Sequence, residues 1–192
     1  MNELFQRIEQ EIPRLRRYAR ALTRDPSSAD DLVQDCLTRA LGKAHLWREG
    51  TDLRAWLFTI LHNQHVNRVR RSVREGIAVS ASDAEPALVA SASQVSRIEL
   101  RDLERALARL PEEQRQVVLL VGLEGMRYET VAEIMGVPVG TVRSRLSRGR
   151  EALRQMMGGD AERRQAAAEA GARAARRAQL NAAQPIPLRA TA

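Results

Sequence analysis

Arginines and serines that repeat at the spacing of one helical turn are the residues of this 192-residue chain best suited to chemical recognition. They lie in the segment YETVAEIMGVPVGTVRSRLSRGREAL, which begins at Tyr128. Arginine reads guanine through two hydrogen bonds, serine can contact bases or phosphates, and backbone N–H groups at a helix start suit a phosphate. The pattern therefore predicts DNA binding by Gly140, Thr141, Arg143, Ser144, Ser147 and Arg148.

Apolar and small residues in the same segment predict the turn that would present this surface. Gly136 suits a left-handed stop between two helices, and Ala132 and Gly149 are small where helices must approach closely. Apolar residues line the inner faces of both helices: Val131, Met135, Val137, Val142, Leu146 and Leu153. These steps are typical of a helix-turn-helix, whose second helix enters the major groove. The alternative, a basic amphipathic surface helix, would not need the glycine and the small residues.

Other reactive residue types form no catalytic or metal-binding constellation. No carboxylate or second cysteine completes a metal site around His45, His62 and His65. Cys36 and Trp56 fall on apolar helical stripes, so we expect both in the core. There is no Ser-His-Asp arrangement, phosphate-binding loop or pair of catalytic carboxylates. We therefore expect a protein that is not an enzyme and that needs neither metal nor cofactor.

Composition and charge narrow the class of partner. The net charge of +7 favours a polyanion, with nucleic acid first and an anionic membrane surface second. No run of 18 apolar residues is present and the first ten residues do not read as a signal peptide, so no membrane span is expected. The single cysteine cannot form an internal disulfide, which fits a reducing cytoplasm.

The elements that must position these residues are helices. In residues 1–74 the pattern predicts a helix over about residues 3–22 that Pro13 bends or divides, and a second helix capped by Ser27 or Ser28. A third is predicted to begin near Asp52. In residues 97–157, we expect helices over about 98–110, 111–124, 128–135 and 139–157.

The chain divides into four segments on composition. Between two small helical domains, residues 1–74 and 97–157, residues 75–96 are rich in alanine and serine and predict a flexible linker. Residues 158–192 are rich in alanine and arginine without an apolar stripe, which predicts a mostly disordered tail. The predicted fold class is all-α.

Two stretches, in this order, resemble one protein family. Residues 110–153, which read LPEEQRQVVLLVGLEGMRYETVAEIMGVPVGTVRSRLSRGREAL, closely resemble region 4 of sigma factors. DPSSADDLVQDCLTRAL from Asp25 and DLRAWLFTILHNQHVNRVRR from Asp52 resemble region 2. Order and spacing together resemble the extracytoplasmic-function (ECF) group of the sigma-70 family over roughly residues 4–157. The resemblance implies a subunit that binds core RNA polymerase and directs promoter recognition, DNA melting and transcription initiation.

The resemblance also implies roles for individual residues. The exposed face of the DDLVQD helix would dock on the clamp helices of the largest polymerase subunit: Asp31, Gln34, Asp35 and Arg39. The loop of residues 46–52, together with Asn63, would hold a flipped base of the −10 element. Further along the same helix, contacts near the −10 element would come from Asn67, Arg68, Arg70, Arg71 and Arg74. The helix-turn-helix would read the −35 element.

Partners and alternatives follow from the same resemblance. An anti-sigma factor is the usual partner of the family and blocks these surfaces. One alternative is a sigma mimic that titrates an anti-sigma factor without initiating transcription. Another is an ordinary helix-turn-helix regulator, which would leave the DDLVQD helix unexplained. Ser147 stands where relatives often carry a bulkier residue, so the resemblance does not give the −35 sequence.

Overall fold

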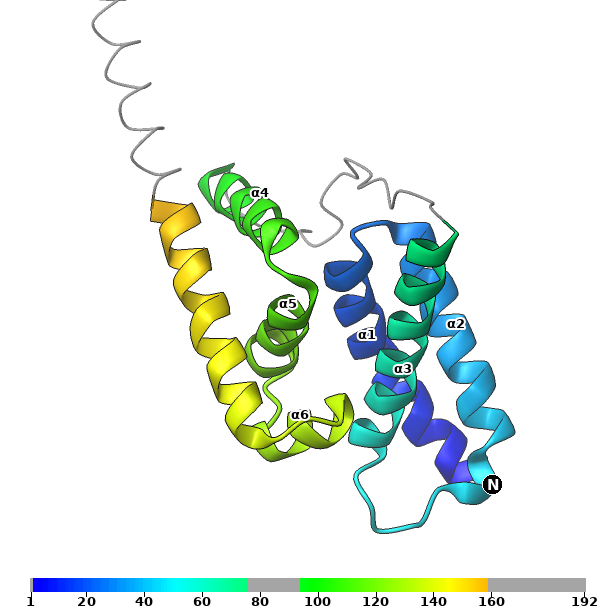
Figure 1. Cartoon of the computed structure of the whole chain (residues 1–192). Helices are drawn as coiled ribbons and strands as arrows, with labels where there is room; N and C mark the ends of the chain where they lie inside the picture. The colour runs from blue at the N-terminus through cyan, green and yellow to red at the C-terminus, as the bar shows by residue number, and fades with distance from the viewer. Residues whose placement is uncertain (1, 76–93, 159–192) are drawn as a thin grey trace, which may run out of the picture. The chain divides into compact units, whose positions relative to one another are not determined.

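The computed structural model describes residues 2–75 and 94–158, and within these ranges all regular structure is helical (Figure 1). The predicted all-α class is confirmed. The predicted linker and tail fall largely on residues 76–93 and 159–192, outside the described ranges. The elements are α1 (Asn2–Thr23), α2 (Pro26–Gly42), η1 (Ala44–Leu46), α3 (Leu53–Arg74), α4 (Gln94–Arg109), α5 (Glu112–Val118), the π-helical turn η2 (Leu119–Leu123), α6 (Tyr128–Met135) and a helix over residues 139–158.

Met1–Leu153 form one compact unit, in which α2 packs against α1 and α3. Within this unit, η2 also packs against α1, and α6 packs against α3. Of a second unit, which begins at Arg154, the structure describes residues 154–158, and these are helical.

The starts of two helices show how local chemistry sets their boundaries. Asp25, not Ser27 or Ser28 as predicted, caps α2: its carboxylate accepts the Ser28 amide at 2.7 Å, and Pro26 occupies the first turn. Proline suits that position because it has no amide to leave unsatisfied. α3 begins near Asp52 as predicted, and the Asp52 carboxylate caps it by accepting the Ala55 amide at 3.0 Å.

Pro13 does not divide the first helix, contrary to one of the two predicted outcomes. α1 continues from Asn2 to Thr23 through the proline. Buried residues lie on both sides of it, with Ile8 before and Leu15 after. An interior proline costs about 3 kcal/mol, and the packing of an apolar face on both sides can offset such a cost.

The core between α1, α2 and α3 is built around Tyr18 and Phe58, both fully buried, with ring centroids 5.3 Å apart. Trp56 lies at the edge of this core and is partly buried. Cys36 is fully buried, and its thiol donates to the Leu57 carbonyl at 3.4 Å. Burial raises the pKa of the Cys36 thiol to about 12, so the group stays protonated and unreactive in the folded chain.

The C-terminal described helices end and begin at the predicted proline and glycines. Pro111 caps α5 and stands one position before its first helical residue. Gly125 follows η2 with φ +65°, a left-handed conformation that favours glycine. No helix within residues 2–75 and 94–158 is long and apolar enough to cross a membrane.

Candidate nucleic-acid interface

The turn between α6 and the helix over residues 139–158 is closed by two backbone hydrogen bonds. Gly136 has φ 63° and ψ 38°; its amide donates to the Glu133 carbonyl at 3.3 Å, and the Val137 amide donates to Ala132 at 3.0 Å. This pair of bonds is the usual way in which a left-handed glycine terminates a helix. Pro138 stands one position before the next helix, so the chain changes direction within three residues.

The helix over residues 139–158 has one buried and one exposed face. Val142 and Leu146 are buried, as predicted, and Gly149 is buried beside them. In α6, Ile134 is buried together with Val131, although the sequence pattern did not single it out. The exposed face carries five of the six predicted DNA-binding residues: Gly140, Arg143, Ser144, Ser147 and Arg148.

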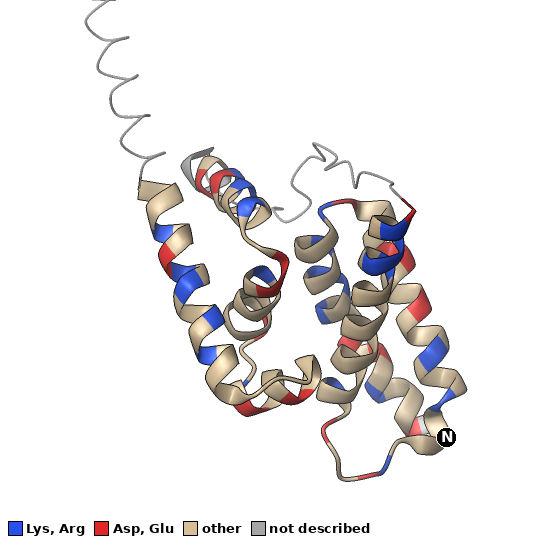
Figure 2. Cartoon of the chain, viewed as in Figure 1, with Lys and Arg blue, Asp and Glu red and all other residues tan. Residues whose placement is uncertain are grey.

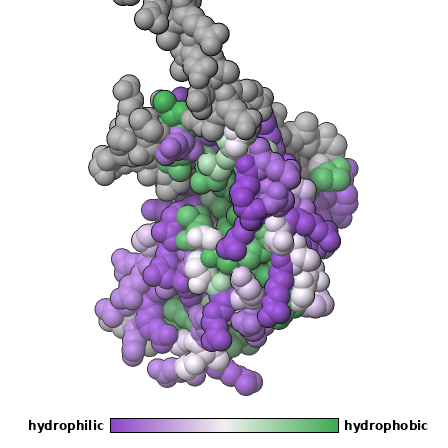
Figure 3. All heavy atoms as spheres, turned by 90° about the vertical axis from the view of Figure 1, so that its left-hand side faces the viewer, coloured by the Kyte–Doolittle hydropathy of each residue, from purple (hydrophilic) through white to green (hydrophobic). Residues whose placement is uncertain are grey.

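Charge and hydropathy follow the same division. Several basic residues are distributed along this helix (Figure 2). The helix lies on the side that Figure 3 turns to the viewer, where hydrophilic side chains surround a smaller hydrophobic area. The surface is thus polar and basic, as a DNA-contacting helix requires.

Two details correct the expected contacts of this helix. The Thr141 amide donates to the Pro138 carbonyl at 2.9 Å, so it is engaged within the turn and not open to a phosphate. Arg145 lies between Arg143 and Arg148 in the sequence, but it pairs with Glu113 of α5 at 2.5 Å and its side chain is only 20% exposed. Arg145 therefore holds the helix against α5 and does not belong to the outward face.

Close packing at Gly149 sets how near this helix lies to α5. A Cβ atom added at Gly149 would meet Val118 Cγ2 at 2.7 Å, whereas one added at Gly140 would meet nothing within 4 Å. The absence of a side chain at Gly149 therefore brings the backbone of the helix against α5.

We expect Gly149→Val to destabilise the chain by about 1–3 kcal/mol, the usual cost of forcing extra atoms into a packed site. Urea unfolding followed by far-UV circular dichroism measures it. Gly140→Ala is the matched control and should be neutral or slightly stabilising. Equal stability of Gly149→Val and wild type would contradict the packing.

The residues predicted to contact the −10 element share one exposed face of α3. Asn63, Asn67, Arg70, Arg71 and Arg74 are exposed at three- and four-residue steps. Arg71 also pairs with Glu75 at 2.7 Å. The opposite face is buried and polar, with His62, Gln64 and His65 inside.

Arg68 links the two surfaces that the sequence treats separately. It donates to Asp35 of α2 at 2.6 Å and to the Ser28 carbonyl at 3.4 Å. The residues predicted to dock on polymerase are all exposed on α2: Asp31, Gln34, Asp35 and Arg39. Arg68 of the predicted −10 surface thus pairs with Asp35 of the predicted polymerase-docking surface.

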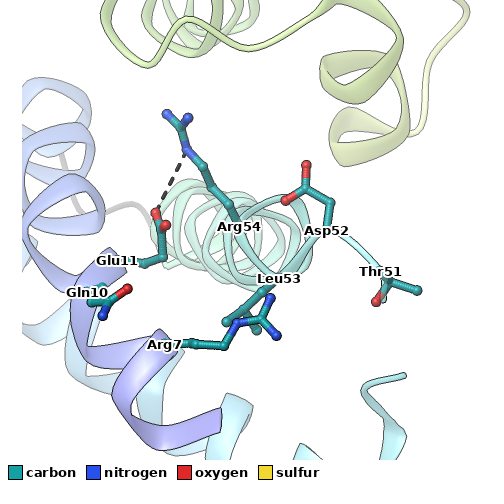
Figure 4. A pocket seen from close by; sticks show the side chains of 7 residues that line it. All are labelled: Arg7, Gln10, Glu11, Thr51, Asp52, Leu53 and Arg54. Atoms are coloured by element: carbon teal, nitrogen blue, oxygen red, sulfur yellow. Dashed lines mark ion pairs between the residues drawn. The ribbon is translucent and has the colours of Figure 1, made fainter. Parts of the chain in front are cut away.

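The loop before α3 lies beside a pocket that the N-terminal helix completes (Figure 4). Its lining comes from α1 and from the junction of loop and helix: Arg7, Gln10, Glu11, Thr51, Asp52, Leu53 and Arg54. Arg7 also lies over the Trp47 ring, 5.1 Å from its centroid. Asn63 does not line the pocket; at ~1.5 Å per residue, it stands about 15 Å further along α3 than Leu53.

Glu124 is a buried carboxylate held by two arginines, and sequence reasoning missed it. The Glu124 side chain is 0% exposed and accepts from Arg17 Nε and Nη2 at 3.0 and 2.9 Å and from Arg54 Nη2 at 2.8 Å. The Leu123 and Glu124 carbonyls accept from the same two arginines. The sequence does contain one signal. Glu124 directly follows the apolar run VVLLVGL, and a carboxylate buried with such a run needs a cationic partner.

A second polar contact ties the start of α5 to α3. His65 Nε2 lies 2.6 Å from Glu112 Oε1, and Glu112 also contacts Arg115 and Gln116. Burial raises the pKa of Glu112, but the His65 hydrogen bond and the Arg115 charge lower it more, so the net pKa falls below its usual value. Burial, and then repulsion from His65, lower the pKa of His62 to about 4.

His62 is expected to make the folded chain acid-sensitive. Its folded pKa of about 4 lies below the usual 6.5, so the unfolded chain binds more protons, and stability is lost as pH falls from about 6.5 to 4. The shift corresponds to about 3 kcal/mol. Urea unfolding at pH 7, 6 and 5 tests this. His62→Gln should reduce the change of unfolding free energy with pH, whereas His45→Gln, at an exposed position, should leave it as in the wild type. If the unfolding free energy of all three proteins changes equally with pH, His62 is not the cause of the acid sensitivity.

Two family models match the chain. The first describes the Sigma2 domain of PhyR and matches residues 8–62. The second describes sigma-70 region 4 and matches residues 100–153. The first match contains the residues predicted to dock on polymerase, but it ends before Asn63 and so before every predicted −10 contact on α3. The second match contains all the residues predicted to read the −35 element.

Individual proteins match over most of the chain. ECF RNA polymerase sigma factor EcfG of Rhodopseudomonas palustris is 38% identical, covering 76% of this chain and 80% of that protein. SigM of Mycobacterium tuberculosis, also an ECF RNA polymerase sigma factor, is 33% identical, and the match covers 82% of this chain and 76% of that protein. Among solved structures, sigma factor RpoE in complex with anti-sigma factor NepR from Bartonella quintana matches with TM-score 0.73 and 34% identity, covering 82% of this chain and 98% of that one.

Proposed function

This chain belongs to the ECF family of RNA polymerase sigma factors, and we propose on that premise that it binds core RNA polymerase and directs initiation at promoters with −10 and −35 elements. In this proposal residues 1–74 and 97–157 act as two modules, joined by residues 75–96. The proposed task is to bind core polymerase and promoter DNA in the cytoplasm and to separate the DNA strands. This task requires no catalytic residue in the chain.

The outward face of the 139–158 helix is the single observation that best supports the proposal. Arg143, Ser144, Ser147 and Arg148 are exposed together, while Val142 and Leu146 of the same helix are buried. A rigid helix that presents two arginines in this way suits base reading in the major groove. We propose this face, with Gly140 at its start, as the −35 reader.

Two exposed surfaces of the N-terminal helices support the other proposed contacts. α2 presents Asp31, Gln34, Asp35 and Arg39, which we assign to polymerase docking. α3 presents a basic stripe, which we assign to −10 DNA: Asn63, Asn67, Arg68, Arg70 and Arg71. Because Asp35 holds Arg68, docking on polymerase would compete with this pair and release an arginine toward DNA.

An anti-sigma factor is the proposed regulatory partner. The relative RpoE is solved with the anti-sigma factor NepR, and a 24% identical neighbour of the same fold, CnrH, is solved with the cytosolic domain of CnrY. A partner that covered the α2 or α3 surface would prevent the proposed contacts.

One observation favours a second candidate function. Residues 8–62 match the Sigma2 domain of PhyR, and PhyR is described as an anti-anti-sigma factor in a solved complex. A mimic of this kind would bind an anti-sigma factor without initiating transcription. It would have no use for the exposed Arg143 and Arg148, so we rank it second.

Run-off transcription tests the proposal directly. Core RNA polymerase is incubated with fragmented genomic DNA, with and without the purified chain. New transcripts with discrete start points are expected only when the chain is present. Core binding without transcripts on any fragment would favour the mimic, and no core binding would leave a helix-turn-helix regulator.

A further inference from the structure

Arg17 and Arg54 converge on one anion from two different helices. Arg17 of α1 contacts Glu124 through Nε and Nη2, and Arg54 of α3 contacts the other carboxylate oxygen. Charge-assisted bonds from several guanidinium N–H groups to one group are also how arginines hold a phosphate. The pair is therefore an anion site that the chain fills with its own carboxylate. We call the form with this contact the closed chain.

Promoter binding, as proposed above, is incompatible with the closed chain. The centres of −10 and −35 elements are about 25 base pairs apart, or about 85 Å at ~3.4 Å per base pair. A compact unit of this length is only about 40 Å across. The α3 surface and the 139–158 helix can reach both elements only if Glu124 leaves Arg17 and Arg54.

One of the two vacated arginines, Arg54, would lie beside the loop that is proposed to hold the flipped base. Arg54 lines the same pocket as Thr51 and Asp52 (Figure 4). Its Nε is buried without a hydrogen-bond partner among the described residues and lies 3.9 Å from Glu11. The half-buried Trp47 belongs to the same loop, and Arg7, which lines the pocket together with Arg54, lies over its ring. Basic residues beside an aromatic side chain suit single-stranded DNA, whose phosphates bind the cations while its bases stack.

We propose that Arg17 and Arg54 form a phosphate-binding site for the single-stranded DNA of the −10 element, and that Glu124 occupies this site in the closed chain. Glu124 is then an internal competitor of the promoter strand. The inference rests on the proposed sigma function and adds to it two DNA-binding residues and one inhibitory residue.

Binding of the full chain to a fluorescein-labelled, random-sequence 20-nucleotide single strand tests the inference, with anisotropy read at 50–200 mM KCl. Glu124→Gln should tighten binding by roughly three- to tenfold and steepen the salt slope by about 0.7, the contribution of one added phosphate contact. Glu113→Gln is the matched control, because it removes the same charge from another arginine partner. Adding Arg17→Gln and Arg54→Gln should abolish the gain.

Equal affinities of Glu124→Gln and Glu113→Gln would overturn the inference, and so would a gain that survives loss of both arginines. Tighter binding to core polymerase without tighter DNA binding would instead assign the site to an acidic group of polymerase. If Glu124→Gln loses its helical circular dichroism, single Arg17→Gln and Arg54→Gln variants decide: each should weaken DNA binding, whereas Arg16→Gln on the same helix should not. Run-off transcription by the wild-type chain separates failure of this inference from failure of the proposed function.

Discussion

Replacing Arg143 and Arg148 together by alanine is expected to reduce promoter-directed transcription by at least about 30-fold. Both side chains are exposed on the helix proposed to enter the major groove. A bidentate arginine–base contact contributes about 1–3 kcal/mol of discrimination, so two contacts together give at least about 2 kcal/mol. Run-off transcription at the promoters found with the wild-type chain measures the loss.

The charge-matched control is the double variant Arg101→Ala/Arg109→Ala, because both residues are exposed on α4. It should retain most transcription, and both double variants should bind core polymerase like the wild type. Equal losses in the two double variants would mean that overall charge, rather than base reading, accounts for the effect.

The largest effect on stability is expected for Phe58→Ala, at about 3–5 kcal/mol. Phe58 is fully buried, its ring packs against Tyr18, and the Arg54 guanidinium lies 5.7 Å from its centroid. Loss of the ring leaves a cavity where α1 and α3 meet, and a domain is stable by only about 5–15 kcal/mol. Urea and thermal unfolding measure the change.

Val73→Ala is the control for Phe58→Ala, since Val73 is 73% exposed and its truncation should cost less than about 0.5 kcal/mol. Phe58→Leu should lie between the two because it retains most of the buried apolar volume. A cost below about 1 kcal/mol for Phe58→Ala would show that the Tyr18–Phe58 contact does not organise the core.

The helix-turn-helix could be predicted from the sequence because its determinants are local. Gly136 is needed where the backbone turns left-handed, and the three- and four-residue steps of Val142 and Leu146 decide which side of the next helix is buried. Once the buried side is known, Arg143 and Arg148 must face outward. The start of α3 near Asp52 could be predicted as well, because the cap that the structure shows there joins residues only three positions apart.

Sequence alone did not decide between alternatives where neighbouring residues allow more than one local structure. Asp25, Ser27 and Ser28 can all cap a helix, and only the backbone geometry shows that Asp25 does so. Pro13 could bend or divide α1, and the packing of Ile8 and Leu15 on both sides kept the helix whole. Thr141 is at the predicted helix start, but its amide is engaged by Pro138 within the turn.

The sequence by itself determined the helices, the turn between the last two of them and the face that carries Arg143 and Arg148, because each depends on residues within a few turns of one another. The tertiary structure alone decided which distant charges meet. Glu124 is separated from Arg17 by 107 positions and from Arg54 by 70. A chain with 31 basic and 24 acidic residues offers far too many possible pairs for sequence to choose among. The choice is made by packing, because burying Glu124 is tolerable only where cations converge on it.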